Sequence, residues 1–129
     1  MILEDADTAF RILVLAQDEV GQAVQRMLPG DIVVVVDKVD AAHRSLAGAE
    51  LEGTPFDLVL APFEAREAGL VDPDDLEAPM MIYFASPDRS EVETHVLIRP
   101  FLQQELEEKI LEVTMERSKA QTRQMMRIN

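Results

Sequence analysis

The chain has 129 residues, a formal net charge of −13 at pH 7 and no cysteine. This length suits one domain with a single core, the missing cysteine excludes disulfides and thiolate chemistry, and the acidic body disfavours nucleic-acid binding. No apolar run approaches the roughly 20 residues of a membrane span, and the first residues lack a signal-peptide pattern, so we expect a soluble, cytoplasmic protein without a membrane segment.

The first half of the chain predicts two strands, each followed by a helix. The apolar run Arg11–Ala16 is typical of a strand buried on both faces. Glu19–Leu28 follows with apolar residues at helical spacing. Ile32–Val36 is an isoleucine and four valines, which strongly favours a strand. Asp40 is then expected to cap a helix over Ala41–Ala49.

The second half of the chain continues the alternation of strands and helices. Three further apolar runs predict strands, at Leu58–Ala61, Met80–Phe84 and Val96–Ile98. Glu64–Leu70 is expected to form two helical turns, and Ala85–His95 has room for one or two. From Phe101 onward the pattern is helical. Alternating strands and helices predict an α/β fold with a parallel sheet.

Three motifs in this order resemble the receiver domain of bacterial two-component response regulators. They are the opening strand Arg11–Leu15, the approach Phe56–Leu60, and Leu97–Phe101, whose Arg-Pro-Phe is similar to the family's Lys-Pro-Phe. The resemblance spans about residues 11–115. It implies a flavodoxin-like, five-stranded parallel sheet in the order 2-1-3-4-5. It also implies a cis peptide bond before Pro100.

The same resemblance implies a degenerate receiver, because residues of its phosphorylation site are replaced. The acidic pair falls on Ala16 and Gln17, the phosphoacceptor aspartate on Pro62, and the hydroxyl position on Phe84. Only the basic position is kept, as Arg99. Family chemistry needs carboxylates that hold Mg²⁺ and an aspartate that accepts the phosphoryl group. A conventional, phosphorylated regulator would require an alignment shifted by several residues.

Other polar residues give weaker signals. Asp18 and Glu64 should lie near the same sheet edge, where we expect Asp18 to cap the first helix and Glu64 to be solvated. Asp18 can also pair with Arg99 and fill the vacated pocket. Asp57 begins its strand, at the opposite edge. His43 and His95 are far apart in the sequence and are expected at the surface.

These observations predict a phosphorylation-independent pseudo-receiver, which is a protein-interaction or regulatory module of bacterial signal transduction. We expect no enzymatic activity, no cofactor and no metal site. An alternative hypothesis is a sensor that binds a small ligand or anion in the vacated acidic pocket beside Arg99. The shortened Ala85–His95 segment would leave apolar sheet surface near Tyr83 or Val96 uncovered.

The last helix divides into two parts. Its apolar residues Leu102, Leu106, Ile110 and Val113 should face the sheet, whereas Leu111, Met115, Met125 and Met126 make up a candidate interaction surface. Residues 1–116 carry a formal charge of −17 and residues 117–129 carry +4. We therefore divide the chain into an N-terminal extension (1–10), the pseudo-receiver (11–115) and a helical extension or connector (116–129). The extension is either a frayed, solvated helix end or a connector. As a connector, we expect it to contact a second copy of the chain, a protein partner or a covalently linked output domain.

Overall fold

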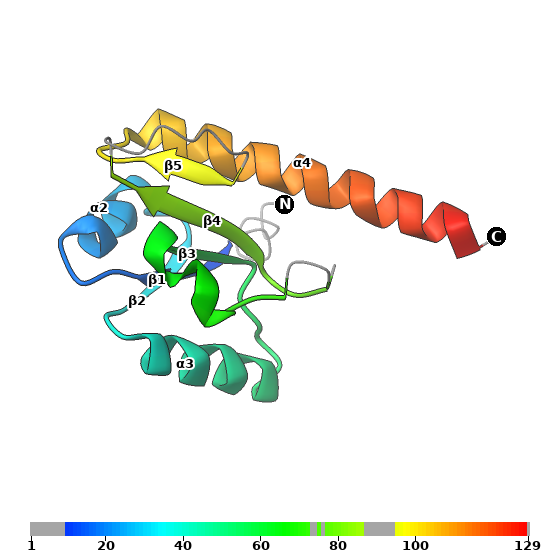
Figure 1. Ribbon diagram of the computed structural model, residues 1–129, viewed down its shortest axis with the longest axis horizontal. Helices are drawn as coiled ribbons and strands as arrows, with labels where there is room; N and C mark the ends of the chain where they lie inside the picture. The colour runs from blue at the N-terminus through cyan, green and yellow to red at the C-terminus, as the bar shows by residue number, and fades with distance from the viewer. Residues whose placement is uncertain (1–9, 73–74, 76, 87–94, 129) are drawn as a thin grey trace, which may run out of the picture.

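A computed structural model describes residues 10–72, 75, 77–86 and 95–128, and the side chains of all these except 124, 125, 127 and 128. Five parallel strands form one sheet in the order β2-β1-β3-β4-β5, a flavodoxin-like α/β fold (Figure 1). This is the predicted fold class and strand order. The elements in chain order are β1 (Arg11–Leu15), α2 (Val20–Met27), β2 (Ile32–Val36), α3 (Val39–Leu51), β3 (Leu58–Pro62), the 3₁₀ helix η1 (Phe63–Ala68), β4 (Met80–Ala85), β5 (Val96–Ile98) and α4 (Gln103–Ile128).

The strands are continuous apolar runs because helices or loops cover both faces of the sheet. β3 lies at the centre, and its Leu58, Val59 and Leu60 have no exposed surface. β1 pairs with β2 over its whole length, with Leu15 opposite Val36. β2 is an edge strand, and its residues are correspondingly half-buried or exposed.

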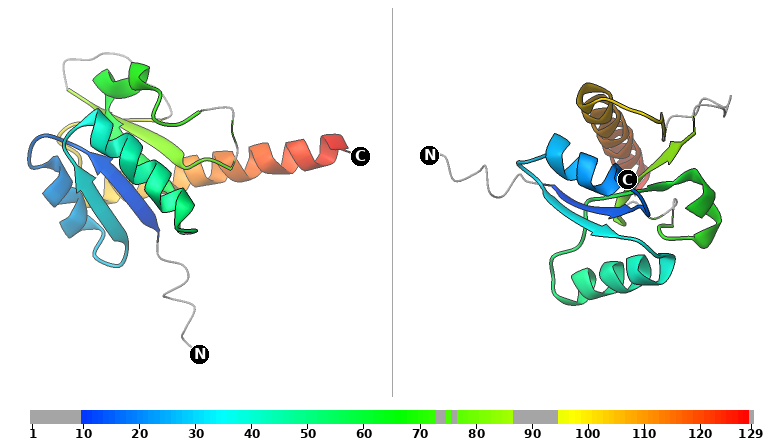
Figure 2. Two further views of the ribbon diagram at one scale, coloured as in Figure 1. Left: turned by 90° about the horizontal axis from the view of Figure 1, so that it is seen from below. Right: turned by 90° about the vertical axis from the view of Figure 1, so that its left-hand side faces the viewer.

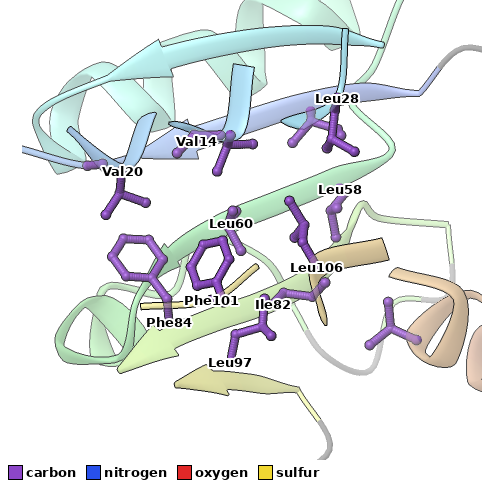
Figure 3. Packing of buried hydrophobic residues seen from close by; sticks show 14 residues of the cluster. Val14, Val20, Leu28, Leu58, Leu60, Ile82, Phe84, Leu97, Phe101 and Leu106 are labelled. Carbon is purple, nitrogen blue, oxygen red and sulfur yellow. The ribbon is translucent and has the colours of Figure 1, made fainter. Parts of the chain in front are cut away.

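The helices α2 and α4 lie on the same face of the sheet (Figure 2). There, Val14, Leu60 and Ile82 from three neighbouring strands meet Leu28, which follows α2, and Leu106 of α4 (Figure 3). These side chains form one apolar cluster, and all of them are at least nine-tenths buried. The cluster therefore fixes the first half of α4 against the sheet.

The helix α3 covers the opposite face of the sheet. Ala42 and Ala49 of α3 pack with Leu13 of β1 and Val59 of β3. The segment that follows β3 covers the rest of this face, because η1 contacts both β3 and β4. One face is thus covered by two helices, and the other by one helix and a short 3₁₀ helix.

Two predictions of local structure need correction here, and a third lies mostly outside the described residues. α3 begins at Val39 with Lys38 as its N-cap, so Asp40 lies in the first turn, where its charge still favours the helix dipole. The two turns expected over Glu64–Leu70 are η1, which begins one residue earlier and ends at Ala68. Residues 87–94 of the expected short turn are not described.

The helix α4 packs on the sheet through Leu106 and Val113, which are buried, and Ile110, which is half-buried. The prediction that Leu102 also faces the sheet is wrong, because its side chain is 69% exposed. Leu102 immediately precedes the helix, and its backbone N–H donates to the Glu105 carboxylate at 2.7 Å. This is half of a capping box, so position 102 ends a loop and does not begin the apolar stripe.

The second half of α4 extends away from the sheet (Figure 1). The helix crosses residue 115, the expected domain boundary, without a break. Arg117 still contacts the body, since its Nη1 donates to the backbone oxygen of Ala78 at 2.7 Å. Within the described part of the chain, no helix is both long and apolar enough to cross a membrane.

Gly21 sets the distance between α2 and the sheet. A Cβ at this position would overlap Cγ1 of Val35, whereas a Cβ at Gly48 of α3 would meet nothing within 4 Å. Gly21→Ala should lower the free energy of unfolding by about 1–3 kcal/mol through overpacking. Gly48→Ala, the matched control, should raise it by about 0.5–1 kcal/mol through helix propensity.

Urea denaturation of the two variants measures both effects. Adding Val35→Ala to Gly21→Ala should recover part of the lost stability, because it removes the overlapping atoms. A Gly21→Ala protein as stable as the wild type would show that α2 does not pack as described.

Candidate functional site

A pocket of about 410 Å³ opens at the carboxyl edge of the sheet, where the loops after the parallel strands meet. The structure brings together in it the five positions that the resemblance predicts for a degenerate phosphorylation site: Ala16, Gln17, Pro62, Phe84 and Arg99. Asp18 and Glu64, expected near this edge, line the same pocket. Residues distant in the sequence therefore converge on one site.

The pocket has an apolar floor. Ala16 and Phe84 are 5% and 3% exposed, and Pro62 ends β3 in register with Phe84 of β4. The Phe84 ring belongs to the same core cluster as Val20 and Phe101 (Figure 3). Neither Ala16, Pro62 nor Phe84 carries an oxygen ligand or a hydroxyl group. The side chains of the floor consequently offer no nucleophile for a phosphoryl group and no oxygen ligand for a metal ion.

Asp18 and Arg99, two charged residues of the pocket, form an ion pair. Asp18 follows β1, and its Oδ1 accepts the N–H of Val20 at 3.0 Å, which fixes the start of α2. Its Oδ2 accepts a hydrogen bond from Nη2 of Arg99 at 2.8 Å. The expected pairing of Asp18 with Arg99 is confirmed, whereas its expected role as helix cap needs correction, because the N-cap of α2 is Glu19 and Asp18 lies one residue before it. One carboxylate thus joins the loop after β1 to the loop after β5.

Arg99 is fixed by one backbone hydrogen bond and two contacts of its guanidinium group. Its backbone N–H donates to the oxygen of Ala85 at 2.8 Å, and its guanidinium lies 5.6 Å from the centroid of the Phe84 ring. The Arg99–Pro100 peptide bond is cis, as the resemblance implies. With Asp18 on its other side, this guanidinium is already paired within the chain.

The pKa of Asp18 is lowered from its ordinary value. The main cause is the hydrogen bond from Val20 N–H, and the hydrogen bond and positive charge of Arg99 act in the same direction. Partial desolvation of the carboxyl opposes them. The lowered pKa shows that the surroundings favour the ionised form of Asp18, and hence the ion pair.

Asp37 is a member of the pocket that sequence reasoning missed. It follows β2, whose carboxyl end meets the same edge, and its backbone oxygen accepts a hydrogen bond from Nε2 of Gln17 at 3.3 Å. The sequence could have indicated this position, because Asp37 directly follows the predicted strand Ile32–Val36. Among the described residues that line the pocket, Asp18, Asp37 and Glu64 carry carboxylates and Arg99 carries the one positive charge.

No three acidic, histidine or cysteine side chains among the described residues lie close enough together to hold a metal ion. The three carboxylates share a pocket but do not converge on one point. Asp57 lies at the amino end of β3, where its Oδ2 accepts the N–H of Arg11 at 2.9 Å. That contact ties two strands together, so Asp57 is at the edge opposite the pocket, as predicted.

A second hollow, of about 340 Å³, lies over β4 on the face covered by α3. Tyr83 and Met81 of β4 line it with both His95 and Arg117. Burial raises the pKa of Tyr83, and the positive charge of Arg66 opposes the shift. The surface near Tyr83 lines a partly apolar hollow, and residues 87–94 of the segment expected to leave it uncovered lie outside the described residues.

The two histidines are at the surface, as predicted. His43 is exposed on α3, and Nε2 of His95 lies 3.3 Å from Oε1 of Glu116. They lie in different parts of the fold and do not share a site.

Neither a family model, nor a curated protein, nor a solved structure gives a significant match to this chain. The resemblance to receiver domains therefore rests on the motifs of the sequence, the strand order and the convergence of the substituted positions in one pocket.

The Asp18–Arg99 pair should stabilise the fold weakly. Both side chains are more than one third exposed, so Asp18→Asn should lower the free energy of unfolding at pH 7 by about 0.5 kcal/mol. Asparagine keeps an oxygen for the N–H of Val20 but loses the charge. Because the pKa of Asp18 is lowered in the folded state, its stabilisation is present above the ordinary aspartate pKa of about 3.9.

As the pH falls through the lowered pKa, this stabilisation is lost, and the two proteins should become equally stable. Urea titrations from neutral to strongly acidic pH measure the difference. Glu64→Gln, which removes a carboxylate from the same pocket but leaves the pair intact, is the control. A difference between wild type and Asp18→Asn that is independent of pH would contradict the ion pair.

Proposed function

We propose that this protein is a degenerate receiver that acts without phosphorylation, as a protein-interaction or regulatory module of cytoplasmic bacterial signalling, and that it is not an enzyme. The strand order supports the receiver resemblance. The stronger support is that five positions drawn from four different strand ends line one pocket, as the resemblance requires.

The observation that carries the proposal is Pro62 at the end of β3. In a receiver this position supplies the carboxylate that attacks phosphorus, whereas a proline ring has no nucleophile. Ala16 and Gln17 stand in place of the acidic pair, so this position lacks the carboxylate oxygens that Mg²⁺ prefers as ligands. Phosphoryl transfer depends on both the acceptor and the metal ligands, and the pocket has neither arrangement.

The contacts of Arg99 support a second part of the proposal, namely that the pocket keeps a single conformation in the absence of a partner. Its guanidinium binds Asp18 and lies over Phe84, two contacts made by the protein itself. A change between two conformations needs a difference in free energy between them. With no phosphoryl group to supply that difference, binding of a partner protein is the simplest source.

The charge of the pocket weakens the alternative of an anion sensor. Asp18, Asp37 and Glu64 outnumber Arg99, and Arg99 is already paired. An incoming anion would have to displace the carboxylate of Asp18 and approach two further acids. We therefore favour the interaction module over the sensor.

The surface proposed for partners lies on α4. Leu111, Met115 and Met126 are 60%, 51% and 70% exposed on a helix that packs on the sheet through Leu106, Ile110 and Val113. Met125, predicted to belong to this surface, has a side chain outside the described set. Exposed apolar side chains grouped along one helix are typical of a protein interface.

The chain should not take up a phosphoryl group. After incubation with acetyl phosphate and Mg²⁺, intact-mass spectrometry should show the unmodified mass, because no carboxylate occupies the position of Pro62. A conventional receiver treated in the same way is the positive control. A stable phosphoryl adduct that disappears in Asp18→Asn or Glu64→Gln would overturn the proposal, since these carboxylates line the pocket.

A further inference from the structure

The outer face of α4 carries an uncharged stripe. At about 100° per residue, positions 111, 115, 118, 122 and 126 fall within a sector of roughly 80°. They are Leu111, Met115, Ser118, Thr122 and Met126, and all five are exposed. The stripe is about 22 Å long at the helical rise. It ends in apolar residues and has small polar residues near its middle.

The charges of α4 are separated along its axis. From Gln103 to Glu116 the helix has five glutamates and one lysine, a formal charge of −4. From Arg117 to Ile128 it has four basic residues and no acid, a formal charge of +4. The two halves are therefore equal in size of charge and opposite in sign.

We propose that α4 pairs antiparallel with α4 of a second copy of this chain, about a two-fold axis near residues 118 and 119. This inference rests on the proposed interaction module and names its partner. In this register Leu111 lies opposite Met126 of the second copy, and Met115 lies opposite its Thr122. Ser118 lies beside the axis, where small side chains let two helices approach closely.

Charge complementarity selects the second copy and the antiparallel direction. In this register residues 109–116 of each helix, with Glu112 and Glu116, lie against residues 121–128 of the other, with Arg123 and Arg127, whereas parallel pairing places like charges together. A two-fold axis makes every favourable contact occur twice. Exposed ion pairs contribute little affinity, so the apolar ends of the stripe hold the helices together and the charges set their direction.

The shape of the molecule permits this arrangement. Ile110 and Val113 turn toward the sheet, so the stripe faces away from the body in the first half of α4. The second half extends beyond the sheet (Figures 1 and 2). The extending half of each copy can therefore lie along the outer face of the body-bound half of the other.

Sedimentation equilibrium tests the pairing. Leu111→Glu and Met126→Glu should each weaken dimerisation at least about tenfold, because each places a carboxylate against an apolar residue. Leu51→Glu is the matched control, since Leu51 is 89% exposed at the end of α3, and it should leave dimerisation unchanged. Added salt should weaken an antiparallel dimer and strengthen a parallel one. A wild-type monomer at high concentration, or a dimer that salt strengthens, would overturn the inference.

Single cysteines test the direction, because the natural chain has none. Under mild oxidation, Ser118→Cys should form a disulfide dimer at least about tenfold faster than Ala120→Cys, whose side chain lies on the opposite side of the helix. A mixture of Leu111→Cys and Met126→Cys should cross-link faster than either variant alone. Self-linking of both single variants without gain in the mixture would show parallel pairing and overturn the proposal.

The two proposals fail separately. A phosphoryl adduct with intact cross-linking would remove the pseudo-receiver function but leave the antiparallel dimer. Cross-linking of Ser118→Cys no faster than that of Ala120→Cys, in a protein that takes up no phosphoryl group, would remove the dimer alone.

Discussion

Burial of the sheet on both faces is the constraint on which the rest of this structure depends. β3 lies at the centre, and Leu58, Val59 and Leu60 have no exposed surface, so every neighbouring element must supply apolar side chains. A parallel sheet covered in this way leaves its polar chemistry to the loops at one edge. The pocket lies at the carboxyl edge of the sheet because all five parallel strands end there.

The same constraint connects the proposed loss of a phosphorylation site with the stability of the fold. In the pocket, Phe84 is both floor and core, and Arg99 lies over its ring. The Asp18–Arg99 pair joins the first and last strand ends across that floor. In the degenerate receiver that we propose, groups that pack or pair with one another stand where a receiver binds metal and phosphate, and this suits the proposed interaction module.

Much of the fold could be predicted from the sequence, because strands buried on both faces must be continuous apolar runs. The Asp18–Arg99 pair followed from the rule that parallel strand ends meet. Applied to β2, that rule would also have found Asp37. The prediction for Leu102 was wrong because helical spacing alone does not locate the start of a helix. The hydrogen bond from the Leu102 N–H to the Glu105 carboxylate places Leu102 just before the helix.

The amide NMR spectrum recorded during titration with beryllofluoride and Mg²⁺ tests the central claim most directly. Beryllofluoride with Mg²⁺ mimics a phosphoryl group on a receiver carboxylate. We predict no saturable shift at the pocket residues Ala16, Asp18, Phe84 and Arg99, because the floor offers no carboxylate and Arg99 is already paired. Saturable shifts centred on these residues would show a working phosphorylation site and contradict the account.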